Sequence, residues 1–266
     1  MAQGPANDAP QHDPALHEKE PKVEARLEPF LDADFHVLSP ALARDPQYND
    51  RRLVLRRKLL ALGKVFAERA RASGAPIDVR TSLHAPHAFN KNQVKRMWVY
   101  ACRDKKEKAR LKKTLGADLA KDLDASYRNA YLCVALEHDF LEVSLRIHAD
   151  AWYDGQNLKN RVKKEGTAMW LALLNALPGY QLKLADWKGE WPCGKLTRER
   201  LDEFLKYYQP AEHACTIERR FPAPHGARAA VLGESVPEQV VEGLLSLVPL
   251  YRFSAWSEES EFLFTR

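Results

Sequence analysis

Residues capable of acid–base chemistry and anion binding lie close together in the run SLRIHADAWYDGQNLKN, residues 144–160; they are Arg146, His148, Asp150 and Asp154. A histidine can carry a proton near neutral pH, and an aspartate can accept or orient one. The run passes from an alternating strand pattern to a helix start near Asp154, where free N–H groups favour an anion. It therefore predicts a catalytic corner for a phosphorylated or otherwise anionic substrate.

The same residues also have a purely structural interpretation. Asp154 would then cap the following helix, while Arg146 would pair with Glu142 on a solvent-facing sheet and Trp152 would belong to the core. Residue types and spacing alone do not separate this interpretation from the catalytic one, and both stay open at this point.

Substrate contacts are expected around this corner and in a loop over residues 80–90 that would form its other wall. They are Arg80, His84, His87, Asn90, Trp152, Asn157 and Lys159. The two loop histidines could also share a metal, but only if the loop curls and a third ligand such as His148 joins them. Because no HExxH or CxxC element accompanies them, the sequence assigns no metal ligands and leaves any cofactor unknown.

Positive charge is concentrated in one block of the chain. Residues 51–128 hold 21 basic and 7 acidic groups, a net +14, although the whole chain carries only +5. Lysines and arginines on helices can neutralise phosphates, so we expect binding to nucleic acid or another polyanion. The expected contacts are Arg52, Arg56, Arg57, Lys58, Lys105, Lys106, Lys112 and Lys113, with Tyr48, Trp98, Tyr100 and Tyr127 as stacking surfaces.

No RNP, KH, zinc-finger or basic-zipper pattern makes the nucleic-acid prediction more specific. A basic face can also be merely solvated, or can bind an acidic segment of the same chain. A third possibility is a structural or complex-forming protein that uses the face to bind an acidic protein partner.

A β-hairpin around residues 130–148 is the clearest local prediction. A two-residue turn at His138 and Asp139 pairs Leu136 with Leu141, which places the large aliphatic side chains of both strands on one face. The opposite face receives Tyr131, Cys133, Ala135 and Glu137 from one strand and Glu142, Ser144, Arg146 and His148 from the other.

The hairpin must be positioned by helices on its aliphatic face. Asp45 and Pro46 predict the start of a helix that runs to about Ala72, and Asp104 predicts the cap of another that ends at Gly116. The run from Asn90 to Cys102 has helical spacing, although its aromatic and β-branched residues also suit a strand. A last strand is expected over residues 250–256.

These elements predict an α+β fold with a mixed or antiparallel sheet and the hairpin at its centre. Residues 1–24 are rich in proline and poor in large apolar side chains, so a disordered tail is expected before a single domain over 25–266. Within that domain, the basic helical part would cover about 45–125, and the sheet with its helices about 126–266. The absence of a signal peptide, a membrane span or paired cysteine motifs favours a cytoplasmic protein without a membrane partner.

Overall fold

The computed structural model describes residues 27–82, 92–121, 123–185, 187–226 and 230–264, and its centre is an antiparallel sheet. Within these ranges seven strands pair in the order β1-β2-β3-β4-β7-β5-β6, and every pair is antiparallel. The strands are β1 Ile77–Thr81, β2 Arg96–Arg103, β3 Tyr131–Glu137, β4 Phe140–Ile147, β5 Gln181–Leu184, β6 Trp191–Pro192 and β7 Cys215–Pro222. The expected α+β fold is confirmed, and its sheet is purely antiparallel. The expected tail, residues 1–24, lies outside the described residues.

The hairpin β3–β4 has the predicted register. Leu136 pairs with Leu141, Val134 with Val143, and Leu132 with Leu145. All six of these side chains have no exposed surface. The alternation along each strand therefore gives the sheet one continuous aliphatic face.

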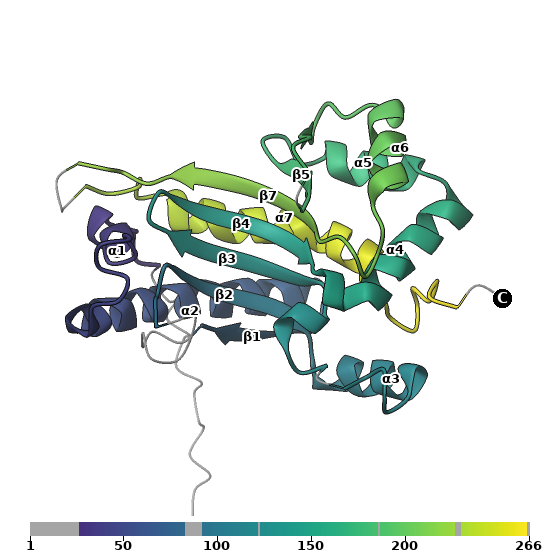
Figure 1. The fold of residues 1–266 in the computed structure, drawn as a ribbon, viewed down its shortest axis with the longest axis horizontal. Helices are drawn as coiled ribbons and strands as arrows, with labels where there is room; N and C mark the ends of the chain where they lie inside the picture. The colour runs from purple at the N-terminus through teal and green to yellow at the C-terminus, as the bar shows by residue number, and fades with distance from the viewer. Residues whose placement is uncertain (1–26, 83–91, 122, 186, 227–229, 265–266) are drawn as a thin grey trace, which may run out of the picture.

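Two long helices pack on this aliphatic face, namely α2 Asn49–Ala72 and α7 Val236–Ser254. Figure 1 shows both helices on the same side of the sheet, behind β2, β3 and β4 in that view. Gly63 lets α2 approach closely, because a Cβ there would lie 2.6 Å from Val99 Cγ2 and 2.7 Å from Val79 Cγ1. The main core fills the space between these helices and the strands.

The remaining helices lie around the edges of the sheet (Figure 1). They are α1 Asp32–His36, α3 Lys105–Leu115, α4 Trp152–Glu165, α5 Ala168–Asn175 and α6 Arg198–Tyr207, with short 3₁₀ helices η1 Pro46–Tyr48, η3 Ser126–Arg128 and η4 Ala149–Ala151. In the part of the chain that the structure describes, no helix combines the length and the apolar character that a membrane span requires.

Two expected elements are wrong. The helix expected between Asn90 and Cys102 is strand β2 from Arg96 onward, and it lies between β1 and β3. Met97, Val99 and Ala101 of this strand face the core, and the aromatic residues Trp98 and Tyr100 between them made the run also match helical spacing. The strand expected at 250–256 is the end of α7, which continues through Pro249 to Ser254. That helix end is buried on most sides, so periodicity could not distinguish it from a strand.

The second face of the sheet carries polar and aromatic side chains, and none of the described helices lies across it in Figure 1. Strand parity places Arg96, Trp98 and Tyr100 of β2 on this face, next to alternate residues of β3 and β4. Below, this surface is called the open face; its strands also contribute Arg80, Tyr131, Cys133, Glu137, Glu142, Ser144, Arg146, Lys183, Glu218 and Arg220.

Candidate functional site

The structure separates the residues of the predicted catalytic corner, starting with Asp154. Its side chain and that of Arg103 have no exposed surface, and the two form a bidentate ion pair with N–O distances of 2.5 and 3.0 Å. The same carboxylate accepts the backbone N–H groups of Ala130 at 2.6 Å and Trp256 at 2.8 Å. Burial opposes the charged form of Arg103, but the Asp154 carboxylate, together with Tyr251 and Tyr153, raises the arginine pKa overall.

The expected helix-capping role of Asp154 is therefore wrong. The N-cap residue of α4 is Ala151, and no side chain caps that end of the helix. The Asp154 side chain instead turns inward and joins β2, the start of β3 and the segment after α7. Four donors occupy its two oxygens, which leaves little capacity for a substrate.

His148 and Asp150 stay together at the surface. His148 Nδ1 lies 3.3 Å from Asp150 Oδ2, and each side chain is 47% exposed. The imidazole also contacts the Tyr127 ring, with 6.0 Å between the ring centroids. Arg146 is held by Glu142 instead, so the corner retains a surface histidine–aspartate pair rather than one convergent set of groups.

The expected substrate contacts have separate positions. Asn157 is buried, donates to the Ser254 carbonyl at 3.3 Å and accepts the Phe262 N–H at 2.8 Å. Lys159 donates to the Tyr208 carbonyl at 3.0 Å. Trp152 is half-buried, and Arg80 is exposed on β1. His84, His87 and Asn90 lie outside the described residues, so the expected wall at 80–90 stays a prediction.

Part of the basic block is used inside the fold. Arg52 has no exposed surface and donates to the carbonyls of Leu42 at 2.5 Å and Asp45 at 2.9 Å. Burial lowers its pKa despite the charge of Asp45. Lys58 is also buried and pairs with Asp34 at 2.7 Å. Arg56 donates to the Ser82 carbonyl at 3.2 Å. The exposed members of the predicted set are Arg57, Lys105, Lys106, Lys112 and Lys113.

A more concentrated arrangement of charge lies on the open face, centred on Glu142. One oxygen of this fully buried carboxylate accepts from Arg96 at 3.2 Å, from Ser144 at 2.6 Å and from Arg146 at 2.6 and 3.0 Å. Burial opposes its charged form, but the two guanidinium groups outweigh this and lower its pKa. The other carboxylate oxygen, Oε2, is buried without a hydrogen-bond partner among the described residues.

The two arginines border a shallow hollow on the open face. Its volume is about 160 Å³, and its lining residues are Arg96, Trp98, Tyr131, Cys133 and Arg146. The arginine side chains are 29% and 25% exposed; Glu142 holds both, and Glu137 also accepts from Arg96 at 2.5 Å. Aromatic rings continue from the hollow across the strands, with centroids 4.8 Å apart for Trp98–Tyr100 and 5.9 Å for Tyr100–Tyr131.

The groups around the hollow are suited to binding rather than to proton transfer. Burial raises the pKa of Cys133 to about 11 and that of Tyr131 to about 12. Both groups are therefore neutral at physiological pH, which makes the thiol a poor nucleophile and the phenol a poor base. Two fixed guanidiniums beside aromatic rings can instead hold an anionic group next to a planar one.

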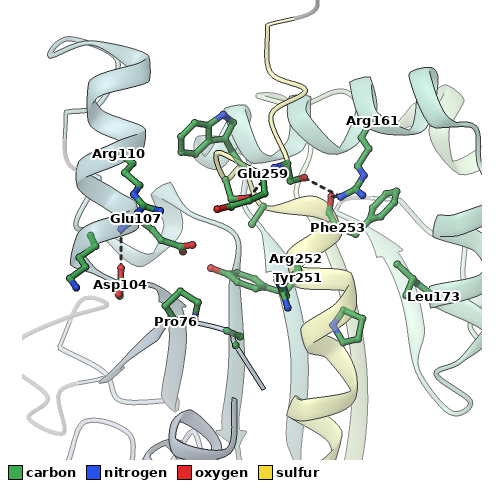
Figure 2. Close-up of a pocket in the computed structure, with 18 of the residues that line it drawn as sticks. Pro76, Asp104, Glu107, Arg110, Arg161, Leu173, Tyr251, Arg252, Phe253 and Glu259 are labelled. Atoms are coloured by element: carbon green, nitrogen blue, oxygen red, sulfur yellow. Dashed lines mark hydrogen bonds between the residues drawn. The ribbon is translucent and has the colours of Figure 1, made fainter. Parts of the chain in front are cut away.

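A larger cleft, about 750 Å³, lies between the start of α3 and the end of α7 (Figure 2). Asp104 caps α3 there by accepting the Glu107 N–H at 2.8 Å, as the sequence predicted. On the opposite wall, Arg161 donates to the Ser260 hydroxyl at 3.0 Å. Acidic and basic side chains alternate around this cleft, and this distribution points to no particular class of ligand.

No family model matches the chain, and no curated protein is similar to it in a sequence search. The geometry of the described residues is therefore the basis for the proposals below.

Proposed function

We propose that the protein binds single-stranded nucleic acid across the open face. The observation that carries this proposal is the position of Arg96 and Arg146 beside the half-buried rings of Trp98 and Tyr131, which both pack against the buried ring of Tyr100. Proteins that bind single strands combine cationic groups for the phosphates with aromatic rings on which bases stack. Here both kinds of group occur on one sheet face.

The size of the hollow supports a polymeric ligand over a small one. Sites for whole small molecules usually enclose about 300–1,000 Å³, whereas this hollow encloses about 160 Å³. It is large enough for one phosphate or one edge of a base, and the rest of the ligand would extend along the strands. A single strand suits this surface because its bases can leave the stack, whereas a duplex presents mainly its backbone.

The arginines are preorganised for this role. Because Glu142 fixes both guanidinium groups through its buried oxygen, they lose little conformational freedom when an anion binds. Glu142, Glu137 beside Arg96 and Glu218 at 3.7 Å from Arg146 together offset the charge of the two arginines. The exposed lysines of α3 would therefore supply additional attraction over a longer range. Binding is favoured over catalysis because Asp154 is occupied by Arg103, and because Cys133 and Tyr131 do not titrate near neutrality.

Fluorescence anisotropy with a labelled oligonucleotide tests the proposal. Single-stranded RNA, single-stranded DNA and a matched duplex would be titrated with the full chain at about 50 and about 200 mM salt. We expect the single strands to bind more tightly than the duplex, and we expect affinity to fall with salt. Replacing Trp98 by alanine should weaken single-strand binding by about 5- to 150-fold, the equivalent of about 1–3 kcal/mol for one lost stacking partner.

Trp187→Ala is the matched control, because Trp187 is 47% exposed and stacks on Tyr207 of α6, with 4.4 Å between the ring centroids. Its affinity should equal that of the unmodified protein. Thermal unfolding would establish that both variants fold. The proposal fails if no strand binds at low salt, or if Trp98→Ala and Trp187→Ala bind as tightly as the original chain.

A further inference from the structure

The tip of the β3–β4 hairpin brings together imidazole and carboxylate groups that are distant in the sequence. His138 and Asp139 form the turn between the two strands. The carbonyl of Asp139 accepts the N–H of Ala223 at 2.8 Å, which fixes the tip against the segment that leaves β7. Two residues later in that segment, His225 lies beside the turn, and its N–H donates to the Ala223 carbonyl at 2.9 Å.

The ligand atoms of these three side chains are spaced as a metal site requires. His225 Nε2 lies 3.6 Å and His138 Nε2 lies 3.9 Å from Asp139 Oδ1. One such atom from each of the three residues lies within 4.8 Å of the others, and the imidazole centroids are 4.9 Å apart. Tetrahedral zinc, with bonds of about 2.0–2.2 Å, separates its ligands by roughly 3.3–3.6 Å. Small side-chain movements would therefore complete the site.

A fourth residue, Asp32 of α1, places a carboxylate beside one of the histidines. Asp32 Oδ1 lies 3.6 Å from His225 Nδ1, the nitrogen on the opposite side of the ring from Nε2. Its side chain is only 12% exposed. Its N–H donates to the Ala230 carbonyl at 2.8 Å, so its position is fixed by the backbone. Metal-binding histidines commonly present their second nitrogen to a carboxylate in this way, because it sets the tautomer and increases ligand basicity.

We propose that His138, Asp139 and His225 bind a divalent transition metal ion of the zinc class, with Asp32 as the carboxylate that positions His225. Two neutral imidazoles, one ligand carboxylate and one adjacent carboxylate balance the double positive charge of the ion. Nitrogen and oxygen donors in this proportion suit zinc and its neighbours better than calcium or magnesium, which prefer oxygen ligands. Three protein ligands leave one coordination position for water or for a group from a ligand.

Metal binding would also connect three separate parts of the fold. Asp32 belongs to α1, the turn belongs to the central hairpin, and His225 follows β7. Figure 1 shows α1 beside the hairpin end of the sheet. An ion bound there would stabilise the folded chain by an amount that rises with the logarithm of its free concentration above Kd, since an unfolded chain does not hold these groups together.

The experiment uses the full chain freed of metal by a chelator and then titrated with zinc in competition with a chromogenic indicator. We expect one ion per chain. His225→Ala should weaken binding at least tenfold, and Asp32→Asn should weaken it by about 10- to 100-fold because only the supporting carboxylate is lost. His148→Ala is the matched control, since His148 pairs with Asp150 at the surface, 3.3 Å away, and the described part of the chain places no third metal-binding side chain beside them. It should bind zinc normally.

Cobalt substitution identifies the ligand atoms. Cobalt bound by imidazole and carboxylate should give d–d bands without the intense charge-transfer bands of thiolate ligation, so the four buried cysteines are distinguished from the proposed site. Zinc should also raise the unfolding temperature of the original chain and of His148→Ala, but not that of His225→Ala. The proposal is overturned if zinc does not bind, if His225→Ala binds it unchanged, or if cobalt shows thiolate bands.

Discussion

Replacing Asp154 by asparagine should destabilise the protein strongly. The substitution keeps the size of the side chain but removes the charge opposite Arg103, and both side chains are fully buried. Removing one partner of a buried ion pair typically costs about 3–5 kcal/mol, because the other charge stays in a medium that solvates it poorly. A lost helix cap costs only about 1 kcal/mol. The size of the effect therefore distinguishes the buried pair from the capping role that the sequence suggested.

Equilibrium unfolding in urea measures this difference directly. Asp150→Asn is the matched control, because its carboxylate lies in the same segment but is 47% exposed and is paired with the surface residue His148. Its stability should change by less than about 0.5 kcal/mol, as is usual for surface positions. A loss of about 1 kcal/mol or less for Asp154→Asn would refute the buried-pair argument.

A double-mutant cycle with Arg103→Met adds a second criterion. If the two side chains stabilise each other, Asp154→Asn should cost much less when Arg103 is already absent, and the coupling should exceed about 1 kcal/mol. The double variant will not regain full stability, because the N–H groups of Ala130 and Trp256 still lose a charged acceptor. Additive effects of the two substitutions would contradict the pairing, whatever their individual sizes.

Three further predictions concern the sheet and its two faces. The pKa of Glu142 is lower in the folded chain than in the unfolded chain. Its stabilising contribution is therefore complete above the unfolded pKa of about 4.3 and disappears as the pH falls through the folded pKa. Thermal unfolding should consequently show a smaller loss of stability below about pH 4 for Glu142→Gln than for the original chain. Gly63→Ala should cost about 1–3 kcal/mol in urea unfolding, because its Cβ would overlap two valines of β1 and β2, and an unchanged midpoint would contradict this close packing. Burial raises the pKa of Cys133 to about 11 and that of Cys193 to about 12. A thiol reagent at pH 8 should therefore react slowly with the native chain and rapidly with all four cysteines in denaturant. Fast reaction of the native chain would show that these thiols are accessible.

The parts of the fold that the sequence predicted correctly depend on local contacts. The register of β3 and β4 follows from a two-residue turn and strict alternation, and both signals lie within about twenty residues. Asp45 and Asp104 were recognisable as caps for the same reason, since each accepts an N–H two or three residues later. Even so, Asp45 caps the short helix η1 that precedes α2, rather than α2 itself.

The arrangements that were missed depend on contacts between distant residues. Arg103 meets Asp154 across 51 positions, and no spacing rule connects an arginine at the end of one strand with an aspartate in a later helix. The sequence did place Arg146 and Glu142 on one face of the hairpin. Arg96 and Trp98 could not be added to that face, because their segment was expected to be helical. The alternation R-W-Y at 96, 98 and 100 was the signal that could have found them.

The basic block shows why net charge along the sequence overstates the charge of a surface. A count treats every arginine as solvent-exposed, whereas Arg52 uses its guanidinium to bind backbone carbonyls before α2, and Lys58 neutralises Asp34. These groups stabilise the connection between the N-terminal segment and α2. They therefore cannot also contact phosphates without losing those bonds. The proposed nucleic-acid surface must consequently be formed by other cations. The open face contributes Arg96, which the count did not distinguish, and Arg146, which lies outside the basic block; their shared carboxylate keeps both in place beside the aromatic rings.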